Sequence, residues 1–351
     1  MRTSLRALLG LVAALGMGPA RAAIPAEQDD CLGCHGSDPS QTMDLPSGEQ
    51  LSLFVDQDHF AKSVHGEILR CGDCHSDKSG YPHESKPFQT RRDVTVATYE
   101  QCKSCHFANY TKTLDGVHFA VMAKGNRKAA LCVDCHGSHD IQKPSEPRTR
   151  ISETCARCHE GVAASYGKSV HGRNLAGAAA ADVPVCTDCH RSHDIGGPHQ
   201  QQWELQTVEL CGRCHANEPL MKKYGLSTAV LRTYLADFHG KTASLRQHQG
   251  TTPNGRVVAR CTDCHGVHDI QKASDPGSPV MKANLQKTCT KCHADANANF
   301  PGAWLSHYEP SLKKAPIVYG VKIAYAVLIP FMIGGLGLQI LLHLWRLMVN
   351  R

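Results

Sequence analysis

The ten residues CVDCHGSHDI, at positions 132–141, hold two cysteines, a histidine directly after the second cysteine, and another histidine three positions later. The pentapeptide C-x-x-C-H is the attachment signal for a c-type haem. Two thiols at this spacing can each form a thioether with one haem vinyl group, and the adjacent histidine can then reach the iron. The stretch therefore predicts one covalently attached haem.

The same pentapeptide occurs nine times and accounts for every cysteine of the 351-residue chain, so we predict nine haems c. A disulfide framework would not require a histidine after every second cysteine. Structural zinc sites would not require that adjacent histidine either. The predicted thioether residues are Cys31, Cys34, Cys71, Cys74, Cys102, Cys105, Cys132, Cys135, Cys155, Cys158, Cys186, Cys189, Cys211, Cys214, Cys261, Cys264, Cys289 and Cys292. The predicted proximal iron ligands are His35, His75, His106, His136, His159, His190, His215, His265 and His293.

Aligned in register, the motifs form a two-haem repeat: a histidine, a first C-x-x-C-H, a His-Asp-Ile, and a second C-x-x-C-H. One leading motif at 31–35 precedes four such repeats. The repeats span about residues 59–106, 110–159, 166–215 and 234–293. The first repeat is degenerate, because His83 stands where the others have His-Asp-Ile.

Histidines that recur at matched positions of the repeat are the predicted distal iron ligands. They are His65, His83, His118, His139, His171, His193, His239 and His268. The ninth is His307 or His59, and we favour His307. His139 lies three residues from His136, too near to reach the opposite face of the same haem. We expect His139, and likewise His193 and His268, to serve a different haem.

The composition predicts a fold packed on haem rather than on side chains. Aromatic residues are scarce (8 Phe, 9 Tyr, 3 Trp), whereas Gly (30) and Pro (18) are common. We predict a mainly α and irregular haem domain over residues 24–315 with low strand content, followed by one transmembrane helix. Longer helices are expected at 218–237 and 283–299, and loops at 177–184 and 247–255.

Two apolar segments predict export and anchoring. Residues 1–23 have basic residues, an apolar stretch and a small-residue end, as in a secretory signal peptide. The 23 residues 323–345 carry no formal charge and are long enough to span a bilayer. We predict a membrane anchor with a short cytoplasmic tail at 316–351, placing the haem domain in the periplasm on the bacterial inner membrane.

The formal charge of +6 does not indicate a nucleic-acid partner. Removing Arg2, Arg6 and Arg21 with the signal peptide lowers it from +6 to +3. Nine haems would add two propionates each, giving about −15 with ferrous irons and about −6 with ferric irons. Basic partners are therefore expected, and no nucleic acid.

The motifs resemble those of the doubled C-x-x-C-H families of multihaem c-type cytochromes, which include respiratory cytochromes of metal-reducing and related bacteria. The likeness rests on Ser-Val-His-Gly at His65 and His171, and on C-x-D-C-H-G-x-H-D-I from Cys132 and Cys261, with Arg191 as a variant in the third repeat. It covers nearly the whole mature chain.

The tail around His307 looks like the junction where, in some of these families, the haem domain meets a cytochrome-b-like membrane part. One helix follows here, which implies a bare anchor or a separate cytochrome b or other quinol-oxidising subunit. His343 within that helix would ligate a shared b-haem, line a quinone site, or extend to the cytoplasmic interface beside Arg346.

Two main functions are open at this level. We favour electron transfer in respiration between a membrane quinol-linked complex and periplasmic cytochromes or terminal reductases, without substrate chemistry and with no catalytic residue. The alternative is a reductase of nitrite, hydroxylamine or sulfur oxyanions with one five-coordinate haem, for which the leading haem at His35 is the candidate. A structural subunit fits less well with a membrane anchor.

Overall fold

The computed structural model describes residues 26–78, 81–83, 87–197, 201–249, 258–303 and 307–350. The chain divides into two compact units, Met1–Glu146 and Pro147–Arg351. The boundary falls inside the predicted second two-haem repeat, after its first C-x-x-C-H motif. The predicted signal peptide lies outside the described residues.

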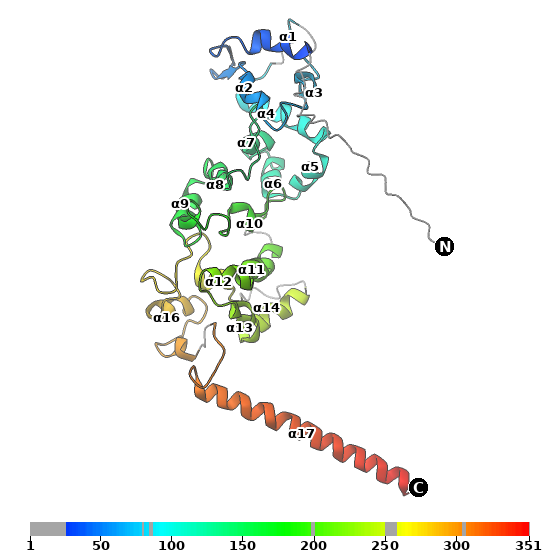
Figure 1. Cartoon of the computed structure of the whole chain (residues 1–351), viewed down its shortest axis with the longest axis vertical. Coiled ribbons are helices and arrows are strands. Elements are labelled where there is room, and N and C mark those ends of the chain that lie inside the picture. Colours follow the sequence, from blue (N-terminus) through cyan, green and yellow to red (C-terminus); the bar gives the residue numbers. More distant parts are fainter. Residues whose placement is uncertain are drawn as a thin grey trace, which may run out of the picture. The chain divides into compact units, whose positions relative to one another are not determined.

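Unit 1 consists of short helices and one small hairpin joined by irregular segments (Figure 1). Strand β1 (Thr42–Asp44) pairs antiparallel with β2 (Gln50–Ser52). The helices are α1 (Ala26–His35), α2 (Gln57–Ala61), α3 (Cys71–Cys74), α4 (Arg91–Thr98), α5 (Phe107–Thr113), α6 (Val117–Ala123) and α7 (Cys132–His136), with the 3-10 helix η1 (Tyr99–Ser104).

Unit 2 repeats this pattern of short helices and ends in one long helix, α17. Its helices are α8 (Thr149–Ala156), α9 (Glu160–Lys168), α10 (Cys186–His190), α11 (Gln201–His215), α12 (Glu218–Lys223), α13 (Ala229–Ala236), α14 (Phe238–Gln249), α15 (Cys261–His265), α16 (Leu285–Cys289) and α17 (Pro316–Val349). The 3-10 helices are η2 (Gly172–Asn174), η4 (Lys282–Asn284) and η5 (Phe300–Ala303).

The predicted fold class, mainly helical and irregular with few strands, is confirmed. The single helix expected at 218–237 is wrong: Gly225 adopts φ +63° between α12 and α13, a left-handed conformation that ends a helix. The helix expected at 283–299 is also wrong, because α16 stops at Cys289. Beyond it, the Asn297 side chain accepts hydrogen bonds from the N–H groups of Asn299 and Phe300, which competes with helix formation.

The expected loop at 177–184 is a series of turns, as predicted. The loop expected at 247–255 is wrong at its start, because α14 continues to Gln249, and its remainder lies outside the described residues.

Buried apolar side chains are few for a chain of this length. Among the described residues they are Leu45, Ala129, Leu175, Val185, Met221, Tyr234 and Ala296. Polypeptides of several hundred residues normally bury most of the surface that their unfolded chains expose. The side chains alone therefore do not form a conventional core in either unit.

The first motif of each two-haem repeat is a short helix that begins at its first cysteine. An aspartate at the third motif position accepts a hydrogen bond from the backbone N–H of the residue before that cysteine. This carboxylate satisfies a donor at the helix start and sits at the positive end of the helix. The four bonds are Arg70 to Asp73 (2.7 Å), Leu131 to Asp134 (2.7 Å), Val185 to Asp188 (2.6 Å) and Arg260 to Asp263 (2.8 Å).

Two side chains, one from the residue before α8 and one from α9, hold the segment that leads into Cys186. Arg148 forms an ion pair with Asp188 at 2.6 Å and donates to the carbonyl of Val183 at 2.9 Å. The Tyr166 hydroxyl of α9 donates to the carbonyl of Pro184 at 2.5 Å. Together these bonds fix the three residues before the motif.

The same devices recur at other motifs. Arg92 of α4 forms an ion pair with Asp134 at 2.7 Å and donates to the carbonyl of Ala129, which, like Val183 in its repeat, lies three residues before the first cysteine. The Tyr234 hydroxyl donates to the carbonyl of Ala259 at 2.9 Å, two residues before Cys261. The repeat is therefore visible in tertiary contacts as well as in sequence.

The residue after the motif histidine adopts a conformation that suits glycine. Gly137 and Gly266 have φ +79° and +84° with extended ψ. In the third repeat Arg191 takes the same conformation, with φ +64° and ψ −177°, where a side chain is strained. Its guanidinium forms an ion pair with Asp194 at 3.0 Å.

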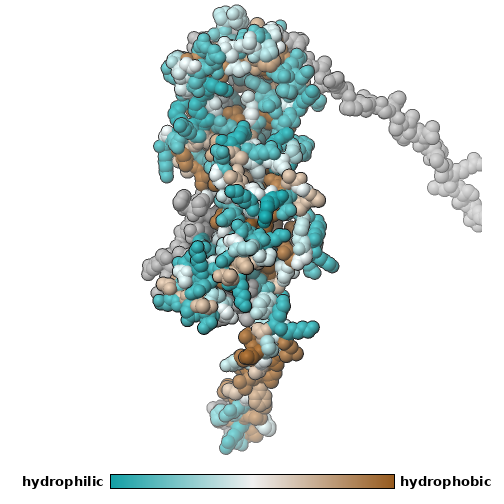
Figure 2. All heavy atoms as spheres, turned by 90° about the vertical axis from the view of Figure 1, so that its left-hand side faces the viewer, coloured by the Kyte–Doolittle hydropathy of each residue, from teal (hydrophilic) through white to brown (hydrophobic). Residues whose placement is uncertain are grey.

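Helix α17 is the one described helix that is long and apolar enough to cross a membrane. Its 34 residues extend about 50 Å at 1.5 Å per residue, beyond the roughly 30 Å of a hydrocarbon core. It continues through Pro330 and is longer at both ends than the predicted span 323–345. Figure 2 shows hydrophobic surface concentrated along this helix, in contrast to the mixed surface above it.

Replacing Arg148 tests whether the arginine clamp stabilises the holoprotein. Arg148→Met removes the ion pair to Asp188 and the bond to Val183, so we expect a loss of about 1 kcal/mol in unfolding free energy. Thermal unfolding of the detergent-solubilised holoprotein measures this. The control Lys168→Met changes an exposed lysine of α9, and it should leave the unfolding temperature unchanged. An equal effect of both variants would show that the clamp does not stabilise the fold.

Candidate haem sites

Histidine rings face one another in pairs throughout the described chain, and each pair joins a histidine of a C-x-x-C-H motif to one outside the motifs. The ring centroids lie 6.0 to 6.3 Å apart. The pairs are His35–His83, His65–His106, His75–His139, His171–His215, His190–His268, His239–His293 and His265–His307.

This separation fits two imidazoles on opposite sides of one iron. A histidine nitrogen binds a metal at about 2 Å, which places each ring centre about 3 Å from it, so two axial rings lie about 6 Å apart. The rings of His35–His83 and His190–His268 are also close to parallel, at 11° and 19°. The donor set and its spacing therefore fit a haem iron with two histidine ligands.

In unit 1, a histidine outside the motifs faces a motif histidine either of its own repeat or of the preceding repeat. His65, at the start of the first repeat, faces His106 of the second motif in the same repeat. His139 of the second repeat instead faces His75, in the first motif of the preceding repeat. His139 thus lies opposite a motif other than its own.

Unit 2 follows the same division. His171 faces His215 within the third repeat, and His239 faces His293 within the fourth. His268, the His-Asp-Ile histidine of the fourth repeat, reaches back to His190 of the third.

The two ends of the array complete this pattern. His83, in the first repeat, faces His35 of the leading motif, which precedes all the repeats. His265 belongs to the first motif of the last repeat, and it faces His307 from the segment before α17.

Backbone hydrogen bonds join the two kinds of distal histidine segment. The Val64 N–H donates to the carbonyl of Ile141 at 2.9 Å, linking the residue before His65 to the His-Asp-Ile of the second repeat. The Val170 N–H donates to the carbonyl of Ile270 at 2.8 Å in the same way. These bonds position histidines that are far apart in sequence.

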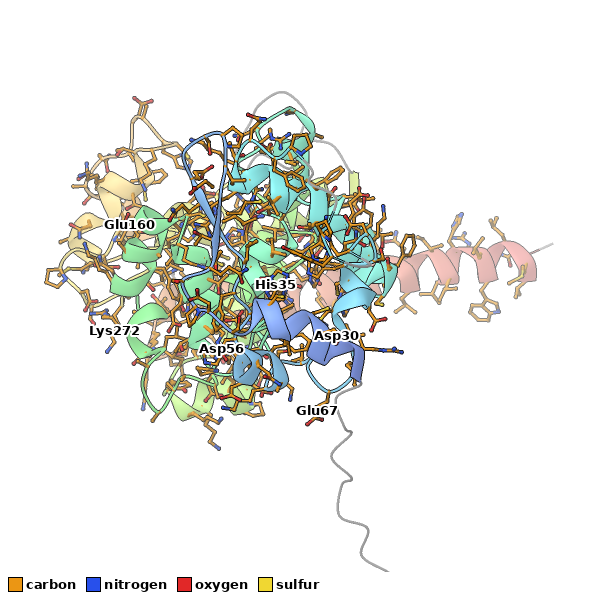
Figure 3. All side chains as sticks on the ribbon, turned by 90° about the horizontal axis from the view of Figure 1, so that it is seen from above. Asp30, His35, Asp56, Glu67, Glu160 and Lys272 are labelled. Atoms are coloured by element: carbon orange, nitrogen blue, oxygen red, sulfur yellow. The ribbon has the colours of Figure 1, made fainter. Side chains whose placement is uncertain are left out.

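Hydrogen bonds to backbone carbonyls orient two of the proximal rings. His35, at the end of α1 (Figure 3), donates from Nδ1 to the carbonyl of Leu53 at 2.8 Å. His190 donates from Nδ1 to the carbonyl of Gly196 at 3.0 Å. Because a carbonyl only accepts, the proton must lie on Nδ1, which leaves the Nε2 lone pair available to a metal.

Burial keeps several of the paired rings neutral. It lowers the pKa of His171 to about 4, and a nearby His215 adds to the effect. Burial likewise lowers the pKa values of His139, His215 and His265. A neutral imidazole is the form that binds a metal, so these rings are in the state that ligation requires.

Cysteines of consecutive motifs are neighbours. The sulfur atoms lie close together in the pairs Cys31–Cys71, Cys102–Cys132, Cys155–Cys186 and Cys211–Cys261. Cys74 also lies near Cys102, Cys189 near Cys214, and Cys264 near Cys289. Within each unit, therefore, every motif lies next to the following one in the sequence.

The structure also places the remaining predicted distal ligands and His59. His118 lies in α6 and His193 just after α10, and both are half-buried. Their role as distal ligands stays a prediction, as does the second ligand for His136 and His159. His59 is 69% exposed and lies 3.5 Å from Asp56, which suits a surface residue.

Sequence reasoning missed the residues that hold the motifs in place. The aspartate at the third position of four motifs was readable as a repeat, and so were Tyr166 and Tyr234, each five residues before a predicted distal histidine. Arg92 lies ten residues before the next cysteine and Arg148 seven, so the two arginines do not fall at matching positions of the repeat and could not be recognised from it.

Three family models match successive parts of the chain. The model for outer membrane cytochrome MtrC/MtrF-like, domains II/IV, matches residues 12–119. The cytochrome c3 model matches residues 124–216, and the doubled CXXCH motif model matches residues 255–298. No curated protein and no solved structure matches the chain. All three models describe haem-binding cytochromes or their attachment motif, and with the paired histidines they show that the chain is a multihaem c-type cytochrome, which carries haem c and transfers electrons.

Proposed function

We propose that the chain is a membrane-anchored periplasmic cytochrome with nine haems c. It carries electrons between a quinol- or quinone-linked membrane complex and periplasmic redox partners in respiration. The observation that carries this proposal is the set of histidine pairs, each of which offers two imidazoles to one iron. An iron held in this way has no open position for a substrate, which favours electron transfer over bond chemistry.

The eighteen motif cysteines form the thioethers, and the nine motif histidines are the proximal ligands. The distal ligands are His65, His83, His118, His139, His171, His193, His239, His268 and His307. The motif histidines that face His65, His83, His139, His171, His239, His268 and His307 at the spacing described above support these assignments.

The contacts between consecutive motifs support a continuous electron path within each unit. Each bound haem c supplies an iron that alternates between the ferric and ferrous states. The chain's part is to hold the attachment points together: the Cys102–Cys132 contact in unit 1 and the Cys155–Cys186 contact in unit 2 are examples. The order of sites along the path then follows the order of motifs in the sequence.

The membrane assignment rests on the two terminal segments. The signal sequence supports export, and α17 supports a single span with Arg346 on the cytoplasmic side. The reductase alternative depends on an iron with an open position at the leading motif. His83 faces His35 at that motif, so the geometry there favours electron transfer.

The haem count is tested by the intact mass of the purified protein. We expect the mature chain, without residues 1–23, to exceed its polypeptide mass by nine haem groups, because each C-x-x-C-H motif attaches one. Replacing both cysteines of one motif, in Cys289→Ser/Cys292→Ser, should reduce the excess by one group. An unmodified protein with fewer than nine groups would contradict the count.

Removing one distal histidine should open one iron. His171→Ala leaves His215 without its partner imidazole, so one of the sites should become high-spin and bind carbon monoxide, whereas the unmodified protein stays low-spin. Electron paramagnetic resonance and optical spectra measure this change. The matched control His59→Ala alters an exposed histidine and should leave the spectra unchanged. If the unmodified protein already binds carbon monoxide, an open haem is present and the reductase alternative gains support.

The respiratory role is tested in membranes of cells that produce the protein. A hydroquinone dissolved in the membrane should reduce the cytochrome, and inhibiting quinol oxidation should prevent this, whereas dithionite should reduce it in either case. The protein in inner membranes should be accessible to proteases from the periplasmic side. Failure of the hydroquinone to reduce any haem would reject the quinol-linked role.

A further inference from the structure

The segment before the membrane helix holds one side of a histidine pair. His307 lies 6.2 Å from His265 between ring centroids, and the two rings are inclined by only 18°. The Thr233 hydroxyl lies 3.4 Å from Nδ1 of His307 and can orient the ring. Glu309 forms an ion pair with Arg232, so a second residue of the segment is tied to α13.

The same segment leads directly into α17, the helix that is long and apolar enough to cross a membrane. We call residues 307–315 the strap; Pro316 begins α17 nine residues after His307. Nine residues span at most about 30 Å when fully extended. The strap is shorter than this, because Ser311 and Lys314 form a turn, with the Ser311 N–H donating to the Lys314 carbonyl at 2.6 Å.

No other described pair is tied so closely to the membrane. Among the paired histidines, the next one back along the chain is His293, 23 residues before Pro316. The last motif in the sequence, Cys289–His293, is not the motif whose histidine faces the strap. The preceding motif has that position, because its His265 faces His307 of the strap.

The side chains at this junction suit a membrane surface. Lys313 and Lys314 lie in the strap and Lys322 in the first turns of α17, where lysines interact with anionic headgroups. The Lys314 ammonium lies 5.3 Å from the ring of Tyr308, and Tyr319 follows in α17. Tyrosines and lysines are typical of the interface between water and lipid.

We propose that the His265–His307 pair marks the membrane end of the electron path, and that electrons enter or leave there rather than at the final motif, Cys289–His293. The inference rests on the proposed quinol-linked function and names the site that faces the membrane partner. When the membrane carrier is the electron donor, it loses one electron, and the ferric iron at this site accepts that electron and becomes ferrous. No bond forms or breaks in the protein.

This placement changes how the path is organised. Cys264 lies near Cys289, and Cys261 lies close to Cys211, so the His265 site has neighbouring motifs on both sides. Electrons entering at His265 can pass back along the chain through the Cys211 motif. The His293 site then lies to the side of this path rather than at its start.

The test compares His307→Met and His307→Ala with the unmodified full-length protein in membranes. Methionine keeps a second ligand on the iron and raises its potential, whereas alanine opens the site. We expect reduction by the membrane-dissolved hydroquinone to slow at least tenfold in His307→Ala. In His307→Met the earliest phase of reduction should carry the altered spectrum of the substituted site.

A redox titration and a control variant distinguish the possible results. Dithionite titration with paramagnetic resonance shows whether one site, and only one, has changed and whether the other haems are intact. His59→Ala serves as the control and should be reduced like the unmodified protein. If the unmodified protein is not reduced by hydroquinone, the proposed function fails.

If the unmodified protein is reduced and both His307 variants, with one altered site, are reduced at the same rate and in the same order, the membrane end lies elsewhere and the inference is overturned. Should His307→Ala lose other haems, His307→Met alone decides the order of reduction.

Discussion

Two imidazole rings must meet about 6 Å apart wherever this chain holds an iron, and the rest of the fold follows from that requirement. The described pairs join a motif histidine to a histidine outside the motifs, often from a different repeat, as with His75 and His139. The backbone therefore folds to bring histidines together rather than to bury side chains. This explains why so few apolar residues are buried, and why Val185, among the most buried of them, directly precedes a motif.

Short helices, polar turns and clamps replace the usual side-chain core. The helix at the first motif of each repeat begins at a cysteine and is held by an aspartate of the motif, and at two of these motifs an arginine distant in sequence binds the segment before it. These bonds are partly exposed, so each contributes modestly. Their role is to fix the spacing of neighbouring attachment points, on which the rate of electron movement between sites depends.

The sequence alone predicted the features that are local or that repeat. The motif set and the mainly helical, strand-poor fold follow from spacing, and the same spacing pointed to histidines that the fold brings opposite motif histidines. The partner of each histidine did not follow, because pairing depends on contacts far apart in sequence. The sequence excluded only the adjacent motif as the partner of His139, His193 and His268. Helix lengths failed where single residues decide, at Gly225 and beyond Cys289. Arg92 and Arg148 lie at positions that do not match between repeats, so the sequence pattern did not predict their roles.

The division of partners in the described pairs bears on how such a chain can lengthen. A repeat keeps one histidine for its own second motif and supplies the other to the first motif of the preceding repeat, as His239 and His268 do. An inserted or duplicated repeat would supply one histidine to the preceding repeat and receive one from the following repeat. Every iron would therefore keep two histidine ligands. Only the ends need special parts: an extra motif at the front to receive His83, and an extra histidine at the back to supply His265. The odd number of motifs and the additional histidine before α17 thus follow from the same arrangement of partners, which allows the chain to lengthen within the array by gene duplication.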